Sequence, residues 1–273
     1  MKKRMARGFS RDESKRCEHK PQESGSPEWF DISSTRAAQN RFFRLCAANA
    51  TPIMRGAFTF NWYAISECFC LESLQYLGLL AKLRVSCKTN LEAIALEKAL
   101  AVAVDIGAGE FGFGQYGREG FHYNMLARLG ELPFVQLNEY DPHVYMKAPE
   151  TNNLLDWISE AFSEVHLGAG VLRVIECTAF DIVLAMDRLF PAGLCVTRGW
   201  SDEQREYISI HLKLEPIHAV AVETLIDALA WSEDARSTID KSTAKTCNLL
   251  GEFWDRMALD VFGPEKQDTK DRE

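Results

Sequence analysis

The sequence has no apolar run that approaches the roughly 18 to 20 residues of a bilayer-spanning helix, so we expect no membrane partner. It has no surplus of basic residues either, because 31 lysines and arginines stand against 39 aspartates and glutamates and the formal net charge is −8. An acidic chain is poorly suited to binding a phosphate backbone. We therefore also expect no nucleic acid among its partners.

The eight cysteines are scattered, and no C-x-x-C pair occurs among them, which argues against a zinc ribbon. Residues 1–28 contain no apolar segment of the kind found in a secretory signal. The cysteines are therefore expected to be reduced thiols, and the expected location is the cytoplasm.

The two ends of the chain differ from its middle. Residues 1–28 and 263–273 are polar and without periodicity, so we expect disordered tails there. Residues 29–262 are expected to form a single helical, metal-binding domain. Apolar residues make up 47% of the chain, which is ample material for its core.

Helical periodicity dominates this middle region, and the alternating Val and Ile pattern of β-strands does not occur. The predicted fold class is therefore all-α. Helices are predicted at residues 33–48, 62–83, 89–104, 118–129, 152–166, 169–189, 202–232 and 235–262. Five glycines between residues 105 and 117 predict a loop after the third of these helices.

The most informative motif is H-x-x-x-E-x-x-H, formed by His211, Glu215 and His218. On an α-helix these residues lie at about 0°, 40° and −20° around the axis, so they share one face. Two imidazoles and a carboxylate on one face suit a borderline transition metal. The alternative is a polar helix face that meets water.

Two further signals complement this motif. Glu119 and His122 form E-x-x-H, which is typical of di-iron carboxylate bundles. Glu176 is a lone carboxylate in an almost wholly apolar helix, where an unpaired charge is rarely fully buried. The alternatives are an exposed pair at a helix start and a Glu at the edge of an apolar face. Together the three signals supply three carboxylates and three histidines, enough for two metal ions.

The order E-x-x-H, lone Glu and H-x-x-x-E-x-x-H resembles the haem-oxygenase-like di-iron oxidases. This family includes fatty-acid decarboxylases, N-oxygenases and oxidases that cleave amino acids. The resemblance covers roughly residues 35–232. It implies a haem-oxygenase-like seven-helix bundle, two Fe(2+) ions per chain, and the use of dioxygen to oxidise a small organic molecule.

The resemblance also implies the metal ligands. The first iron would be held by Glu119, His122, Glu176 and His211, and the second by Glu215 and His218.

The chain departs from the family pattern in three places. Glu215 stands where the family usually has Asp, and Pro216 removes a backbone N–H inside the same helix. The glycine-rich segment before Glu119 is longer than usual, which makes Asp105 a possible substitute for Glu119 as a ligand. The first two departures predict weaker metal binding at the second iron.

The substrate is expected to carry a carboxylate or an amine, and Arg173 and Arg198 are the candidates to hold a carboxylate. Aromatic residues predicted near the site suggest an apolar pocket; they are Trp62, Tyr63, Phe111, Phe113, Tyr116, Phe121 and Tyr123. The remaining expected partners are dioxygen and, as a candidate, a second copy of the chain in a homodimer.

Two other functions are compatible with a helical fold of this kind. One is a metal-free enzyme like thiaminase II, which needs a nucleophilic cysteine beside carboxylates. Cys177 adjoins Glu176, but neighbouring residues on a helix diverge by about 100° and the pair is poorly placed. The other is a helical binding protein without catalytic activity.

Overall fold

The computed structural model describes residues 29–46, 52–111, 121–126, 129, 147–191 and 205–264. Every regular element in these ranges is helical, which confirms the all-α prediction. The elements are η1 (Ile32–Ser34), α1 (Arg41–Leu45), α2 (Pro52–Ser86), α3 (Asn90–Glu110), α5 (Pro149–Ala161), α6 (Val165–Leu189), α8 (Glu206–Leu229) and α9 (Glu233–Phe262). The predicted tail at 1–28, and all but the first two residues of the one at 263–273, lie outside the described residues.

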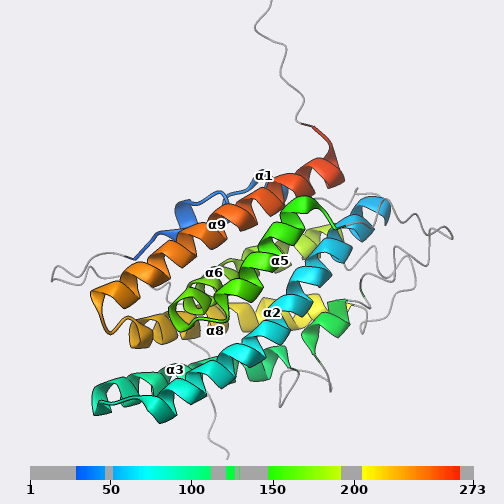
Figure 1. Ribbon diagram of the computed structural model, residues 1–273. Coiled ribbons are helices and arrows are strands. Elements are labelled where there is room, and N and C mark those ends of the chain that lie inside the picture. The colour runs from blue at the N-terminus through cyan, green and yellow to red at the C-terminus, as the bar shows by residue number, and fades with distance from the viewer. Residues whose placement is uncertain are drawn as a thin grey trace, which may run out of the picture.

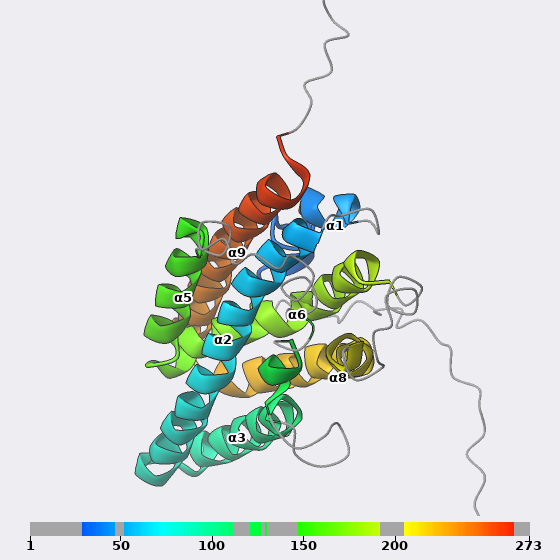
Figure 2. The ribbon, with the colours of Figure 1, turned by 90° about the vertical axis from the view of Figure 1, so that its right-hand side faces the viewer.

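Helix α6 runs through the middle of the bundle, with α9 packed on one side of it and α8 on the other (Figure 1). Figure 2 shows the order α9, α6, α8 and α3 from one side of the molecule to the other. Helix α2 crosses these layers and contacts α3, α5, α6 and α9. Helix α8 is thus enclosed between α6 and α3, so a polar group on its inner face is shielded from water.

Small residues allow the central helices to approach closely. A Cβ at Gly170 of α6 would lie 2.5 Å from the Cβ of Ser242 on α9, and a Cβ at Gly168 would lie 2.8 Å from the ring of Tyr76 on α2. Contacts this short do not occur between packed atoms, so larger side chains at Gly168 and Gly170 would push α6 away from both neighbours.

The helix ends follow from local sequence. The side chains of Thr89 and Ser232 accept hydrogen bonds from the backbone N–H groups of Glu92 and Ala235, which caps α3 and α9. Among the described residues no helix is both long and apolar enough to cross a membrane.

Three predicted boundaries were wrong. Between residues 33 and 46 the chain forms only η1 and the short α1, and α2 begins at Pro52, ten residues before the predicted start. Of the predicted helix at 118–129, residues 121–126 and 129 are described, and all of them except residue 121 are helical.

The third error concerns the predicted glycine-rich loop, because α3 continues as a helix through Gly107 and Gly109 to Glu110. Glycine lowers helix stability by about 1 kcal/mol relative to alanine, so packing must compensate. A Cβ at Gly107 would lie 2.9 Å from the ring of Phe111, and one at Gly109 would lie 3.2 Å from Nε2 of His218. The absence of a Cβ at Gly109 lets α3 lie against α8, where tertiary contact overrides local propensity, and the absence of one at Gly107 leaves room for the ring of Phe111 at the end of the same helix.

Candidate metal centre

The structure brings together four of the predicted ligands on two adjacent helices. His211, Glu215 and His218 lie on the buried face of α8 and are 2%, 3% and 5% exposed. Glu176 projects from α6 and is also buried, and its Oε2 lies 3.1 Å from Nδ1 of His218. Helix α8 continues past Pro216, which is exposed, so the proline does not break the helix that carries the motif.

A further ligand candidate, Glu110, was missed by sequence reasoning. Its Oε1 lies 3.6 Å from Nε2 of His211, 3.7 Å from Nδ1 of His122 and 4.0 Å from Nδ1 of His218. A single carboxylate oxygen therefore faces three imidazoles. Glu110 is the last residue of α3. The glycines around it predicted a loop, so no helical pattern in the sequence pointed to Glu110 as a ligand.

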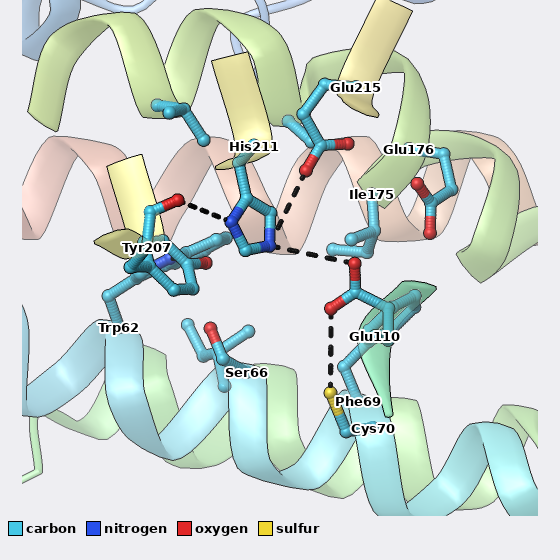
Figure 3. A pocket seen from close by; sticks show the side chains of 13 residues that line it. Trp62, Ser66, Phe69, Cys70, Glu110, Ile175, Glu176, Tyr207, His211 and Glu215 are labelled. Atoms are coloured by element: carbon cyan, nitrogen blue, oxygen red, sulfur yellow. Dashed lines mark hydrogen bonds and ion pairs between the residues drawn. The ribbon is translucent and has the colours of Figure 1, made fainter. Parts of the chain in front are cut away.

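The cluster divides into two groups that could each hold a metal ion. The first contains Glu110, His122 and His211, and the second contains Glu110, Glu215 and His218. Within each group the candidate ligand atoms lie within 4.8 Å of one another, and every residue is buried. Glu110 belongs to both groups, so its carboxylate could contribute a ligand atom to either. Figure 3 shows Glu110, His211, Glu215 and Glu176 converging.

The remaining predicted ligands lie as follows. His122 is completely buried and faces Glu110. Glu119 lies outside the described residues, so its predicted role stays a prediction. Asp105 is exposed on α3 and belongs to neither group.

His211 is oriented by its own helix. Its Nδ1–H donates a hydrogen bond to the backbone carbonyl of Tyr207 at 2.7 Å, one turn earlier. This leaves the Nε2 lone pair facing Glu110 and Glu215. Metal-ligating histidines commonly have their second ring nitrogen fixed in this way, which sets the tautomer and the ring orientation.

Several polar atoms in the cluster have no hydrogen-bond partner in the part of the chain that the structure describes. They are both ring nitrogens of His122 and Oε2 of Glu215. A buried polar atom without a partner costs about 1–3 kcal/mol. Metal ions at the centre would give Oε2 of Glu215 and one ring nitrogen of His122 a partner, so the donor set fits a metal site.

The charges in the centre are strongly coupled. Burial raises the pKa of Glu215 well above its usual range, and the negative charges of Glu176 and Glu110 raise it further. Burial opposes a charge on His218, but the facing carboxylate of Glu176, followed by Glu110, raises its pKa to about 9. Burial also opposes the charge of Glu110, yet the facing imidazoles of His122 and His211 hold its pKa well below the usual range. Without metal, protons on Glu215 and His218 limit the repulsion between the carboxylates.

A small cavity adjoins the centre, and the space in it that the centre of a water-sized sphere can reach is about 30 Å³. Trp62, Ile65 and Phe69 of α2 form one wall, and Ile175, Ala179 and Val183 of α6 contribute to the opposite side. The polar lining is Ser66, Cys70, Glu110, Glu176, Tyr207, His211 and Glu215. An apolar cavity with convergent polar groups at one end is typical of a small-molecule site.

Of the two predicted carboxylate-binding arginines, only Arg173 lies in the described part of the chain. Arg173 donates hydrogen bonds to Glu223 at 2.9 Å and to the carbonyl of Phe30 at 3.0 Å, and it does not line the cavity. Arg198 lies outside the described residues.

The cysteine beside the carboxylates is Cys70, not Cys177. The Sγ of Cys70 donates to Oε2 of Glu110 at 3.8 Å inside the cavity. Cys177 instead contacts Glu223 at 3.6 Å, and burial raises its pKa to about 12. The thiol of Cys70 is also held neutral, because burial, then Glu110 and Glu176, raise its pKa well above the usual value.

No model of a protein family matches the sequence, and no curated protein matches it. Solved structures do match. A CadD-like protein of unknown function from Nostoc punctiforme is similar to this chain with a TM-score of 0.57 and 14% identity, over 85% of this chain and 90% of that one. A TenA homolog from Pseudomonas syringae is similar with a TM-score of 0.55 and 13% identity, over 83% and 87% of the two chains. At these identities the likeness shows the fold alone, and it confirms that this chain has the predicted haem-oxygenase-like helical fold.

Proposed function

We propose that this chain is a non-haem di-iron oxidase or oxygenase that uses dioxygen to oxidise a small organic molecule. The observation that carries the proposal is the convergence of three imidazoles on one oxygen of Glu110, in a buried cluster with two further carboxylates. Imidazole and carboxylate ligands on facing helices suit iron. The three carboxylates would also offset most of the charge of two divalent ions.

In this arrangement Glu110, His122 and His211 would hold one iron, and Glu110, Glu215 and His218 the other. Glu176, beside His218, would add a carboxylate to the second. Bound ferrous iron would supply the electrons that reduce dioxygen. The Tyr207 carbonyl holds the His211 ring in position, and the apolar walls of the cavity keep water away from the reacting groups.

The cavity also constrains the substrate. Its lining, as far as the structure describes it, contains carboxylates and no lysine or arginine. An apolar body against Trp62 and Phe69 is therefore favoured. An amine end would meet the carboxylates, whereas a carboxylate end would need the metal itself as its partner.

The experiment is anaerobic reconstitution with Fe(II), removal of unbound metal, and measurement of iron per chain and of dioxygen consumed. We expect about two irons, and a loss of at least one in His122→Ala and in His218→Ala. His166→Ala is the matched control, because His166 pairs with Glu164 and packs on Trp231 outside the centre. Absence of bound iron, or equal iron in all four proteins, would refute the proposal.

A metal-free, thiaminase II-like activity is the second candidate, because Cys70 lies beside Glu110 in the cavity. A nucleophilic cysteine needs a lowered pKa, and that of Cys70 is raised. Hydrolysis of thiamine by the metal-free protein, lost in Cys70→Ser, would support this candidate over the di-iron oxidase. Binding of small molecules without turnover in either form would instead favour the non-catalytic alternative.

A further inference from the structure

A row of aromatic side chains leads away from the metal centre. The ring of Tyr207 packs on His211 with centroids 4.0 Å apart. The Nε1–H of Trp62 on α2 donates to the hydroxyl of Tyr207 at 3.4 Å. The indole of Trp62 then packs on that of Trp254 on α9, with centroids 5.4 Å apart and an interplanar angle of 32°. Figure 3 shows the first three of these rings beside the cavity.

Trp254 lies next to the outer layer of the bundle. Its ring contacts Phe42 and Phe43 of α1 at centroid distances of 5.1 and 5.0 Å. Helix α1 lies over α9 at the edge of the molecule (Figure 1). The row of rings therefore connects the centre on α8 with the α1–α9 face, across α2.

The chemistry of these rings distinguishes the row from an ordinary apolar core. Indole and phenol rings can lose one electron to a strong oxidant, whereas aliphatic side chains and phenylalanine resist this. Electrons pass rapidly between redox-active rings that are in contact. Tyr207, Trp62 and Trp254 form such a continuous series, and its first member packs directly on a candidate metal ligand.

We propose that Tyr207, Trp62 and Trp254 form a one-electron pathway between the metal centre and the α1–α9 face. The proposal rests on the proposed function, because the oxidant is the iron centre after it has reacted with dioxygen. One electron passes from Trp62 to the centre, by way of the Tyr207 ring, and reduces it. Trp62 becomes a cation radical and keeps its N–H proton, because the neutral phenol that it faces is a weak base.

An electron from Trp254 then restores Trp62, and a one-electron reductant in solution, such as ascorbate, restores Trp254. The net step is the one-electron reduction of the centre and the one-electron oxidation of the reductant. Such a pathway supplies electrons when no substrate is bound, and it keeps the oxidant from attacking the metal ligands.

The test starts with the anaerobic di-ferrous protein, mixed with dioxygen in the absence of substrate and frozen at intervals for electron paramagnetic resonance. We expect an organic radical whose spectrum narrows when the protein contains ring-deuterated tryptophan. Trp62→Phe should lower its yield at least five-fold. Trp254 does not line the cavity. Trp254→Phe removes the residue that restores Trp62, so the radical on Trp62 should live longer.

Trp157→Phe is the matched control. Trp157 is 5% exposed, like Trp62, but it lies on α5 and donates its hydrogen bond to Thr246. Trp157→Phe should therefore leave the radical yield unchanged. A second readout, peptide mass spectrometry after repeated oxidation, should show oxygen added to Trp62 and Trp254 and not to Trp157.

The outcomes separate the pathway from the function on which it rests. Iron that binds and is oxidised without a tryptophan radical, or with equal yields in Trp62→Phe and Trp157→Phe, overturns the pathway alone. A chain that binds no iron removes the oxidant and overturns both. If Trp62→Phe does not fold, Tyr207→Phe keeps the ring packing and decides the question, because it should also lower the radical yield.

Discussion

Binding of metal should release protons from the centre, because the second group of ligands is protonated when metal is absent. With a pKa of about 9, His218 is about 99% protonated at pH 7. Burial and the neighbouring carboxylates also favour a proton on Glu215. A metal ion needs deprotonated ligands, so loading displaces these protons.

The expected magnitude follows from these two groups. Glu110, whose pKa is lowered, contributes none. At pH 7 the release should therefore lie between about one and two protons per chain, one from His218 and up to one from Glu215. At pH 9 the contribution of His218 should fall to about half a proton, because the ring is then half deprotonated before metal arrives.

The assay is isothermal titration calorimetry with Mn(II), a redox-silent substitute for Fe(II), in buffers of different ionisation enthalpy. The dependence of the binding enthalpy on the buffer yields the number of protons released. Glu215→Gln should release fewer protons than the wild type when metal binds. His122→Ala should lower the metal affinity of the first group and leave the number of protons released unchanged. Metal binding without proton release at pH 7 would show that the assigned protonation is wrong.

Further predictions concern stability and ligand positioning. Because the folded-state pKa of His218 is raised above its ordinary value of 6.5, its stabilising contribution is complete below pH 6.5 and is lost as the pH rises through 9. Thermal unfolding of the metal-free protein should show a loss of up to about 3 kcal/mol over this range. Saturating metal at about 100-fold above its dissociation constant should add about 2.7 kcal/mol, seen as a higher melting temperature. Cys70→Ala should weaken Mn(II) binding roughly ten-fold, or about 1.4 kcal/mol, because Glu110 loses the thiol that orients it, whereas Cys70→Ser should retain most of the affinity. Gly109→Ala places a Cβ 3.2 Å from Nε2 of His218 and should weaken binding at the second group, whereas Gly78→Ala, with no atom within 4 Å, should stabilise α2 by up to about 1 kcal/mol and leave metal binding unchanged.

The part of the site that sequence reasoning predicted lies on single helices. His211, Glu215 and His218 are spaced so that helical geometry alone places them on one face, and the structure has them on the buried face of α8. Glu176 was found because a carboxylate in an apolar helix is unusual. These signals need no knowledge of how the helices pack.

Glu110 and Cys70 could not be found in this way, because their roles depend on contacts between helices. Cys70 lies on α2 and meets Glu110 only through the packing of α2 against α3. Glu110 is positioned only because α3 continues through Gly107 and Gly109, where local propensity favours a loop. The close approach of Gly109 to His218 is a tertiary contact and leaves no periodic trace in the sequence.

The position of Glu110 itself argues for function over stability. It is the last residue of α3, where the partial negative charge of the helix end disfavours another negative charge. It is also 9% exposed, so burial adds a second penalty to its ionised form. A residue chosen for stability alone would be neutral or basic at this point. A positive charge beside the carboxylate offsets both penalties, and the carboxylate lies 3.6–4.0 Å from three imidazole rings that can bind a cation. An acidic side chain at the unfavourable end of a helix, held there by glycines that bring α3 against His218, is best explained by a ligand of positive charge between α3 and α8.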